Sequence, residues 1–167
     1  RAHVLAHADL SGRVVVRDVD ANRVLWRSRP HLPPRALTWS SDGRRLLAIA
    51  REKTYLFSGA SGGLLRHGHG GRNVAAAFRP GGEQYALVRR DHRTAESRII
   101  LVGGGRERFL FGTPGPTHGL AWSPDGRWLA VGAQRARAIV LLRPGPDGLA
   151  SARSVPSPGG RLAGWAR

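Results

Sequence analysis

The chain has 167 residues, which is enough for one domain with a hydrophobic core and few for two. It contains no cysteine, which excludes a disulfide scaffold, a cysteine-ligated zinc site and thiol catalysis. Lys and Arg total 27 against 11 Asp and Glu, a formal net charge of +16, so we expect attraction to acidic partners or polyanions.

The predicted elements are short strands rich in Val, Ile, Leu and aromatic residues, bounded by Gly, Pro, Asp and Ser. In chain order the predicted strands are 3–7, 13–19 and 22–27; 36–40, 45–50, 53–58 and 64–67; 73–79, 84–90, 97–102 and 107–111; and 117–122, 127–132, 137–142 and 149–155. We expect no helix, because no stretch keeps a helical period for ten residues without Gly or Pro. No apolar run is long enough to span a membrane.

The strands belong to a repeat. Three segments align without gaps: ALTWSSDGRRLLAIA (36–50), AAAFRPGGEQYALVR (75–89) and GLAWSPDGRWLAVGA (119–133). Their aromatic anchors, with a fourth near the C-terminus, lie 39, 44 and 43 residues apart: Trp39, Phe78, Trp122 and Trp165. A period of this size is typical of four-stranded propeller blades. We therefore expect these four aromatic side chains to be mostly buried, at equivalent places in successive blades.

Each aromatic anchor of the first three segments is followed by a tight turn. The turn anchors are Asp42, Gly43, Asp125 and Gly126. Glycine allows the positive φ that such turns require, while Asp and Pro prefer the earlier turn positions. The sequence therefore predicts hairpins between the first and second strand of each repeat.

The segment Trp122-Ser123-Pro124-Asp125-Gly126, followed by Leu129-Ala130, resembles the TolB-like and WD40-like β-propeller repeats. Through its periodicity the resemblance covers nearly the whole chain, and it implies a propeller fold. The Trp-Asp pair that ends the third strand of strict WD40 repeats is absent, which favours the TolB-like subclass. That resemblance implies an extracytoplasmic protein, periplasmic or on the cell surface.

The predicted fold is all-β, a β-propeller of four four-stranded antiparallel blades in a single domain, 1–167. The blades cover about 1–30 plus 161–167, 31–70, 71–115 and 116–160. The first repeat has three predicted strands, so strand 161–166 would complete its sheet beside 3–7 and close the ring. The alternatives are half of a larger ring, completed by a second chain, or a fragment of a seven- or eight-bladed propeller. We expect a monomer or a symmetric dimer.

The sequence lacks methionine, even at position 1. We therefore expect a processed protein or a piece of a longer one.

Propeller ligands usually meet the loops at one end of the channel, and arginines are frequent in those loops. The candidate ligand-binding residues of this basic rim are Arg51, Arg72, Arg89, Arg90, Arg93, Arg135 and Arg137. Arginines that converge can bind carboxylates or phosphates bidentately. The alternative is a solvated surface whose arginine content reflects a GC-rich genome, since only one of the 27 basic residues is lysine (Lys53).

The sequence predicts no catalytic residue, metal site or cofactor. There is no G-x-S-x-G motif, and Asp91, His92 and Ser97 are triad residue types without evidence of triad geometry. His67 and His69 alternate on one strand, but no third metal ligand is identifiable. Nucleic-acid binding is not favoured, because the loops hold almost no aromatic residue on which bases would stack.

The predicted function is a non-catalytic propeller that acts as a protein–protein interaction scaffold with a basic rim. A protein partner or an acidic ligand is expected. The alternatives are the accessory propeller of a larger hydrolase or sensor protein, and a module that binds polyanions or nucleic acid.

Overall fold

The computed structural model describes residues 3–30, 33–157 and 165. Its strands are β1 (Val4–Ala8), β2 (Val14–Asp18), β3 (Arg23–Arg27), β4 (Ala36–Trp39), β5 (Arg45–Ile49), β6 (Lys53–Ser58), β7 (Leu64–His69), β8 (Arg72–Phe78), β9 (Tyr85–Arg90), β10 (Ser97–Gly103), β11 (Arg106–Thr113), β12 (Thr117–Trp122), β13 (Leu129–Ala133), β14 (Ala138–Pro144) and β15 (Leu149–Pro156). In this part of the chain no helix is long and apolar enough to cross a membrane. The prediction of an all-β chain is confirmed, and the strand ends agree with those predicted to within about two residues.

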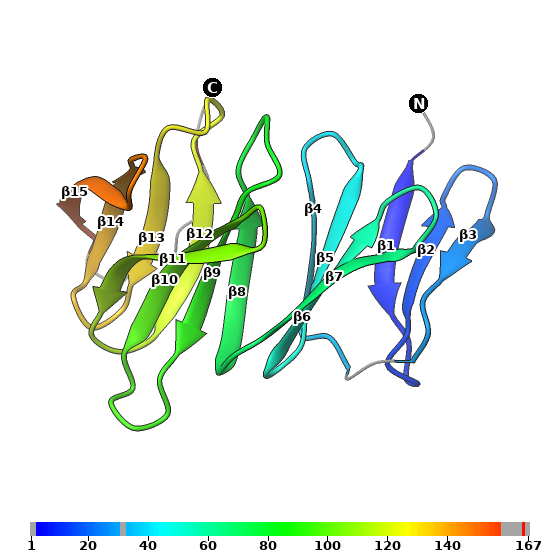
Figure 1. The fold of residues 1–167 in the computed structure, drawn as a ribbon, viewed down its shortest axis with the longest axis horizontal. Helices are drawn as coiled ribbons and strands as arrows, with labels where there is room; N and C mark the ends of the chain where they lie inside the picture. Colours follow the sequence, from blue (N-terminus) through cyan, green and yellow to red (C-terminus); the bar gives the residue numbers. More distant parts are fainter. Residues whose placement is uncertain (1–2, 31–32, 158–164, 166–167) are drawn as a thin grey trace. The chain divides into compact units, whose positions relative to one another are not determined.

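The strands form four antiparallel meanders, in which each strand pairs with the next one along the chain (Figure 1). The orders are β1-β2-β3, β4-β5-β6-β7, β8-β9-β10-β11 and β12-β13-β14-β15. Short hairpin turns make this order the natural one, because antiparallel neighbours need only a few connecting residues. Each sheet is therefore one blade, and the four repeats of the sequence correspond to the four sheets.

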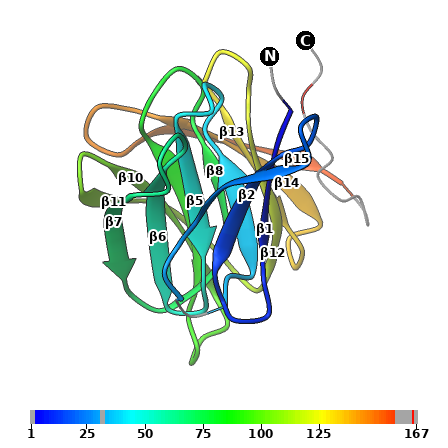
Figure 2. The same ribbon diagram turned by 90° about the vertical axis from the view of Figure 1, so that its right-hand side faces the viewer.

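The four sheets divide into two compact units. The first unit, Arg1–Asn73, holds the sheets β1–β3 and β4–β7, and the second unit, Val74–Arg167, holds most of β8 with β9–β11 and β12–β15. Figure 2 turns the first unit toward the viewer, with β5, β6 and β7 side by side in one sheet. We describe each unit by itself.

The core of the first unit lies between its two sheets. It contains Val14, Val16, Leu46 and Phe57, all at most 1% exposed, with the Trp26 indole beside them. Trp26 Nε1 donates a 2.8 Å hydrogen bond to the carbonyl oxygen of Gly59, in the turn between β6 and β7. A buried indole needs such an acceptor, so Trp26 joins the two sheets by packing and by a polar contact.

Gly62 makes the packing of Trp26 possible. Its φ is +69°, and a Cβ at this position would lie 2.5 Å from the Trp26 ring. A side chain is therefore excluded both by the backbone conformation and by the indole, and only glycine fits.

The core of the second unit is built in the same way. Val88, Ile99, Leu129, Val131 and Leu142 are fully buried between its two sheets. Trp122, at the end of β12, is 8% exposed and donates a 3.0 Å hydrogen bond from Nε1 to the carbonyl oxygen of Ala77 on β8. The aromatic anchor of one blade is thus bonded to the first strand of the preceding blade.

The Ser-x-Asp-Gly turns form the same hydrogen-bond pattern in two blades. Ser40 Oγ donates to Asp42 Oδ1 at 2.6 Å and accepts a bond from Arg45 N at 2.9 Å. Ser123 Oγ does the same with Asp125 Oδ1 at 2.5 Å and with Trp128 N at 2.9 Å. Gly43 and Gly126 have φ of +70° and +67°. The predicted hairpins are confirmed, and the repeated serine ties each turn to the strand that follows it.

The aspartate carboxylates in these turns accept several hydrogen bonds. The serine hydroxyls, and then the backbone N–H groups of Arg44 and Arg127, hold the pKa of Asp42 and of Asp125 below the usual value. The charged form of each carboxylate is the one that the turn binds. The turns are therefore most stable when both aspartates are ionised.

The third repeat replaces this pattern with an arginine. Arg79 stands where the other two turns have serine, and its NH1 donates to Gln84 Oε1 at 2.9 Å. Its Nε donates to the carbonyl oxygen of Gly126 at 2.7 Å, and the guanidinium lies 5.3 Å from the Trp122 ring centroid. Arg79 thus fixes its own turn and, through the neighbouring turn and indole, the adjacent blade.

One prediction about the blades needs correction, and another stays a prediction. The first sheet has three described strands, as predicted, and residues 161–164 and 166 of the predicted closing strand 161–166 lie outside the described residues, so closure of the ring stays a prediction. The burial predicted for the aromatic anchors holds for Phe78 and Trp122, each 8% exposed, but not for Trp165, which is 37% exposed. Trp39 is half-buried. No described residue covers one face of Trp165, and the sheet that precedes Trp39 has three described strands.

Candidate functional site

The second unit has hairpin turns at two opposite ends (Figure 1). The turns after β8 and β12 lie at one end and mix charges, with Arg79, Glu83, Asp125 and Arg127. The hairpin loops 91–96, after β9, and 134–137, after β13, lie at the other end. Arginines predominate at that second end.

Loop 91–96 is shaped by one carboxylate. Asp91 Oδ1 accepts hydrogen bonds from Arg93 N at 2.7 Å and from Thr94 N at 3.0 Å. These backbone donors, and to a lesser extent the charge of Arg98, hold the pKa of Asp91 below its usual value. The carboxylate is therefore used to fold the loop, and the Arg93 side chain is left exposed to solvent.

Contacts with the linker 114–116, between β11 and β12, support this end of the unit. Ser97 Oγ donates to the carbonyl oxygen of Gly115 at 2.8 Å, and Gln134 N donates to the carbonyl oxygen of Pro116 at 3.2 Å. A Cβ on Gly115 would lie 2.9 Å from the Arg135 side chain, so the aliphatic part of Arg135 packs on the glycine. The linker is thus bonded to a strand of one blade through Ser97 and to a loop of the next blade through Gln134.

We define the basic edge as five arginines at this end of the second unit. Four of them are exposed and Arg90 is half-buried: Arg90, Arg93, Arg98, Arg135 and Arg137. The acidic side chains of loop 91–96 are Asp91 and Glu96. Arginine guanidinium groups can each hold a carboxylate or phosphate by two parallel hydrogen bonds.

The sequence prediction missed Arg98. It lies in β10, where alternation places it on the exposed face, two residues beyond the loop. Ser97 and Ile99 on either side of it are buried, so the folded strand shows what the sequence alone did not.

Arg89 has another role. Its NH1 and NH2 donate to Glu107 Oε2 and Oε1, each at 2.9 Å, across β9, β10 and β11. The Arg89 side chain is 19% exposed. This bidentate pair occupies the guanidinium, so we place Arg89 outside the basic edge.

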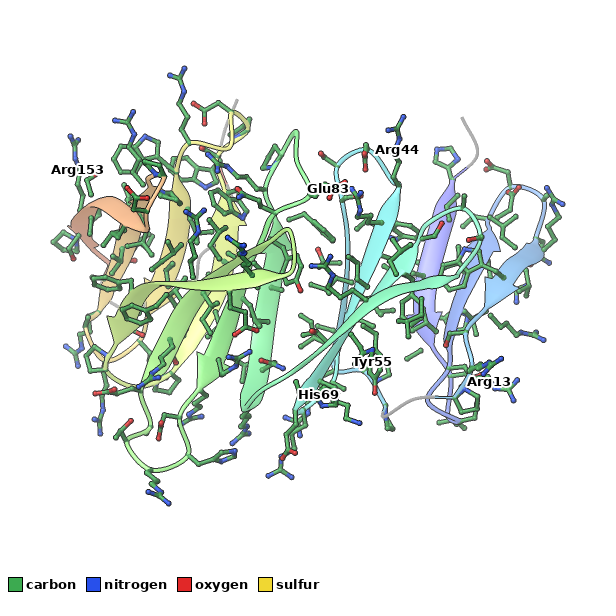
Figure 3. The ribbon with its side chains drawn as sticks, in the orientation of Figure 1. Arg13, Arg44, Tyr55, His69, Glu83 and Arg153 are labelled. Atoms are coloured by element: carbon green, nitrogen blue, oxygen red, sulfur yellow. The ribbon has the colours of Figure 1, made fainter. Side chains whose placement is uncertain are left out.

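The predicted rim residues of the first unit lie at an end of mixed charge. Arg51 is exposed in the turn between β5 and β6, beside Glu52, and its carbonyl oxygen accepts a 2.8 Å bond from Asn73 N. Arg72 begins β8, and its Nε is buried without a hydrogen-bond partner among the described residues. Figure 3 places His69 at this end and Arg44 at the opposite end of the unit.

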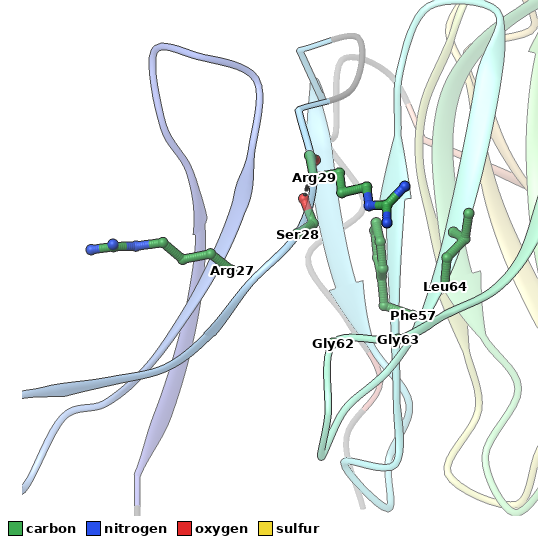
Figure 4. A pocket seen from close by; sticks show the side chains of 7 residues that line it. All are labelled: Arg27, Ser28, Arg29, Phe57, Gly62, Gly63 and Leu64. Atoms are coloured by element: carbon green, nitrogen blue, oxygen red, sulfur yellow. Dashed lines mark hydrogen bonds between the residues drawn. The ribbon is translucent and has the colours of Figure 1, made fainter.

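A separate pocket of about 380 Å³ lies in the first unit, between β3 and the β6–β7 hairpin. Phe57 and Leu64 form apolar walls, and Figure 4 shows the Arg29 guanidinium above Phe57 while Arg27 points away. Ser28 Oγ donates to the Arg29 carbonyl oxygen at 2.7 Å and so fixes the backbone there. With one arginine directed into it, the pocket offers less positive charge than the basic edge.

The residues of catalytic or metal-ligating type have local structural contacts. Asp91 folds its loop, and the Ser97 hydroxyl is buried and bonded to Gly115, so neither carries out a triad role in this arrangement. The His67 and His69 rings lie edge to face, 5.3 Å apart. Within the described ranges no group of three His, Asp or Glu side chains could hold a metal ion.

Comparisons with known proteins give structural but no sequence relatives. No family model and no curated protein matches the chain. The Cps50 (Swd1) β-propeller domain of Myceliophteria thermophila is similar to it in structure, with a TM-score of 0.71 and 18% identity, over 93% of this chain and 53% of that one.

Two further solved structures are similar. Kuenenia stuttgartiensis hydrazine synthase matches with a TM-score of 0.62 and 15% identity over 79% of this chain and 46% of that one. Dihydro-heme d1 dehydrogenase NirN, solved with DHE, matches with a TM-score of 0.65 and 19% identity over 91% of this chain and 34% of that one. The chain therefore has the blade arrangement of a β-propeller and spans about half or less of these proteins.

Proposed function

We propose that the chain is a non-catalytic binding module that holds an acidic segment of a protein partner on the basic edge. The observation that carries this proposal is the presence of five arginines at one end of the second unit, three of them on loops 91–96 and 134–137 and two in the adjoining strands β9 and β10. Preformed loops lose little conformational entropy on binding. Carboxylate groups spaced along a peptide fit several guanidinium groups at once.

The similarity to the Swd1 β-propeller domain supports the propeller fold on which this proposal rests. The proposal for this chain rests on its own charge distribution, because an identity of 18% carries only the fold. Phe, Tyr and Trp are absent from loops 91–96 and 134–137, and His92 has the one aromatic ring there. Stacking platforms for single-stranded nucleic acid are therefore missing there, which favours a protein ligand.

The test asks whether binding depends on the position of the arginines or only on the net charge of the chain. The full chain is titrated with a fluorescent peptide of ten glutamates and, separately, with a single-stranded oligodeoxynucleotide, at several salt concentrations. The double variant Arg90→Ala/Arg93→Ala removes two charges from the basic edge. The matched control Arg44→Ala/Arg127→Ala removes two charges from exposed turns.

We expect the edge variant to bind the glutamate peptide roughly tenfold more weakly or worse, which corresponds to about 1.4 kcal/mol, and the control to change it less than twofold. Equal losses in both variants would attribute binding to net charge and overturn the proposal. Tighter binding of the oligonucleotide than of the peptide would favour a nucleic-acid ligand instead.

A second candidate is an accessory propeller of a larger hydrolase or sensor protein. It is favoured by the solved neighbours that are described as a synthase and a dehydrogenase, both much longer than this chain. Sequencing the gene on both sides of the 167 residues tests it: an adjoining catalytic domain would support this candidate.

A further inference from the structure

The second unit contains an apolar pocket of about 290 Å³ between β11, the outermost strand of one sheet, and the strands β14 and β15 of the next. Its apolar lining residues come from β11, the linker 114–116, the β13–β14 hairpin and β15: Phe111, Pro114, Ala133, Ala136, Val140 and Ala152. Among the described residues no Asp or Glu lines it. Its volume is at the lower end of ligand pockets, so it has room for a single large side chain.

The floor of this pocket belongs to the hydrophobic core. Ala133 and Val140 are 3% and 7% exposed and are members of the core of the second unit, and Phe111 packs against that core. Ala136 and Ala152 are exposed, which places them at the mouth. Since three of these lining residues are alanines, their short side chains leave the hollow open. An apolar side chain that enters such a hollow is removed from water, which favours binding.

The mouth of the pocket adjoins the basic edge. Ala136 lies in loop 134–137, between Arg135 and Arg137 in sequence. Pro114 begins the linker whose next residue, Gly115, packs on the side chain of Arg135. The pocket and two arginines of the basic edge therefore share one loop and the linker beside it.

The loop that carries these arginines is fixed by backbone hydrogen bonds. Arg137 N donates to the carbonyl oxygen of Gln134 at 3.1 Å, and the carbonyl oxygen of Arg137 accepts a 2.8 Å bond from Ser157 N. The pocket and the loop arginines thus keep their spacing. A ligand that uses both must carry its apolar and its charged groups at a matching distance.

The charged side chains that line or flank the pocket are basic. Arg135 and Arg137 flank Ala136, and the charged residue in the lining is Arg153, whose guanidinium lies 5.5 Å from the centroid of the Trp128 ring. An acidic ligand is therefore attracted to the mouth. An apolar side chain without neighbouring carboxylates would leave these arginines without counter-charges.

We propose that the pocket binds one aliphatic side chain of the acidic segment that occupies the basic edge. This inference rests on the proposed function and specifies its ligand: a peptide in which an apolar residue such as leucine is flanked by glutamate or aspartate. The apolar side chain enters the pocket, and the carboxylates on either side bind Arg135 and Arg137. The pocket thus selects among acidic peptides, which the arginines alone attract without distinction.

The test uses two peptides of equal length and charge. One has five glutamates, a leucine and four glutamates, and the other has alanine in place of leucine. Both are titrated into the full chain at several salt concentrations. We expect the leucine peptide to bind about tenfold more tightly, which corresponds to about 1.4 kcal/mol. Both affinities should fall as salt rises, but their ratio should stay constant, because salt does not screen the burial of an apolar side chain.

A variant that fills the pocket connects this preference to the proposed site. Ala152→Leu enlarges an exposed lining residue on β15, away from the loop arginines. It should reduce the tenfold preference to less than twofold while the alanine peptide binds within twofold of its original affinity. The matched control Ala21→Leu makes the same change at an exposed position in the first unit and should retain the preference. Ser154→Leu, also in the lining, repeats the test if Ala152→Leu does not fold.

Failure of this inference differs from failure of the proposed function. Equal affinities of the two peptides for the unmodified chain, or a tenfold preference that survives both pocket-filling changes, would overturn the inference and leave the basic edge as the binding site. The double variant Arg90→Ala/Arg93→Ala should weaken both peptides by a similar factor and keep their ratio near tenfold. Equal losses in that variant and in Arg44→Ala/Arg127→Ala would instead overturn the proposed function.

Discussion

The indole Nε1 of Trp165 lies 2.9 Å from the carbonyl oxygen of Ala121, to which it donates a hydrogen bond. The bond repeats, one blade later, the bond from Trp122 to Ala77. Trp165 therefore occupies the anchor position that follows the sheet β12–β15. Its 37% exposure reflects the face that no described residue covers.

Truncation of Trp122 should destabilise the second unit strongly. Trp122→Ala removes a side chain that is 8% exposed, together with its bond to Ala77 and its contact with Arg79. We expect a loss of about 3–5 kcal/mol in the free energy of unfolding, measured with urea. Leu10→Ala, at a fully exposed position, should change it by less than about 0.5 kcal/mol. Similar values for the two variants would contradict the blade packing.

Two glycines with the same backbone conformation should respond differently to alanine. Gly43 and Gly62 have φ of +70° and +69°, but a Cβ has open space at Gly43 and would clash with Trp26 at Gly62. Gly43→Ala should cost about 1–2 kcal/mol from the left-handed backbone alone. Gly62→Ala should cost roughly 2–5 kcal/mol, because overpacking is added. Chemical denaturation measures both, and equal costs would show that Trp26 does not pack on Gly62.

Acid should weaken the Ser-x-Asp-Gly turns. Hydrogen bonds from the serine hydroxyls lower the pKa of Asp42 and Asp125 in the folded chain below the unfolded value of 3.8. A lowered folded-state pKa means that the stabilisation is complete above the unfolded pKa and is lost as pH falls through the folded pKa. Thermal midpoints should therefore fall on acidification from about pH 5, and less steeply in Asp42→Asn/Asp125→Asn. An unchanged acid slope in that variant would place the dependence elsewhere.

The Arg89–Glu107 pair should contribute to stability and not to ligand binding. Its two 2.9 Å hydrogen bonds have bidentate geometry at a partly exposed site. A double-mutant cycle with Arg89→Ala and Glu107→Ala should give a coupling of about 0.5–1 kcal/mol in unfolding experiments. Arg89→Ala should leave the affinity for the glutamate peptide within twofold, in contrast to Arg90→Ala/Arg93→Ala. A loss as large as that of the double variant would return Arg89 to the basic edge.

Local features of the chain were predictable from the sequence alone. The strands follow from short apolar runs bounded by turn residues, and the turns after Trp39 and Trp122 follow from Ser, Asp and Gly in fixed order. The repeat interval correctly predicted that four sheets succeed one another. These features depend on residues that are close together in sequence, so the sequence pattern is enough to predict them.

Other features were decided by contacts between strands far apart in sequence. Only the tertiary structure pairs Arg89 with Glu107, seats Trp26 against Gly62 and adds Arg98 to the basic edge. It also leaves Trp39 half-buried, although its sequence environment matches that of buried Trp122. The physical reason is that burial and pairing depend on which sheet lies next to a residue. The repeat motif specifies the residue's own blade, and the neighbouring blade determines whether its indole finds an acceptor.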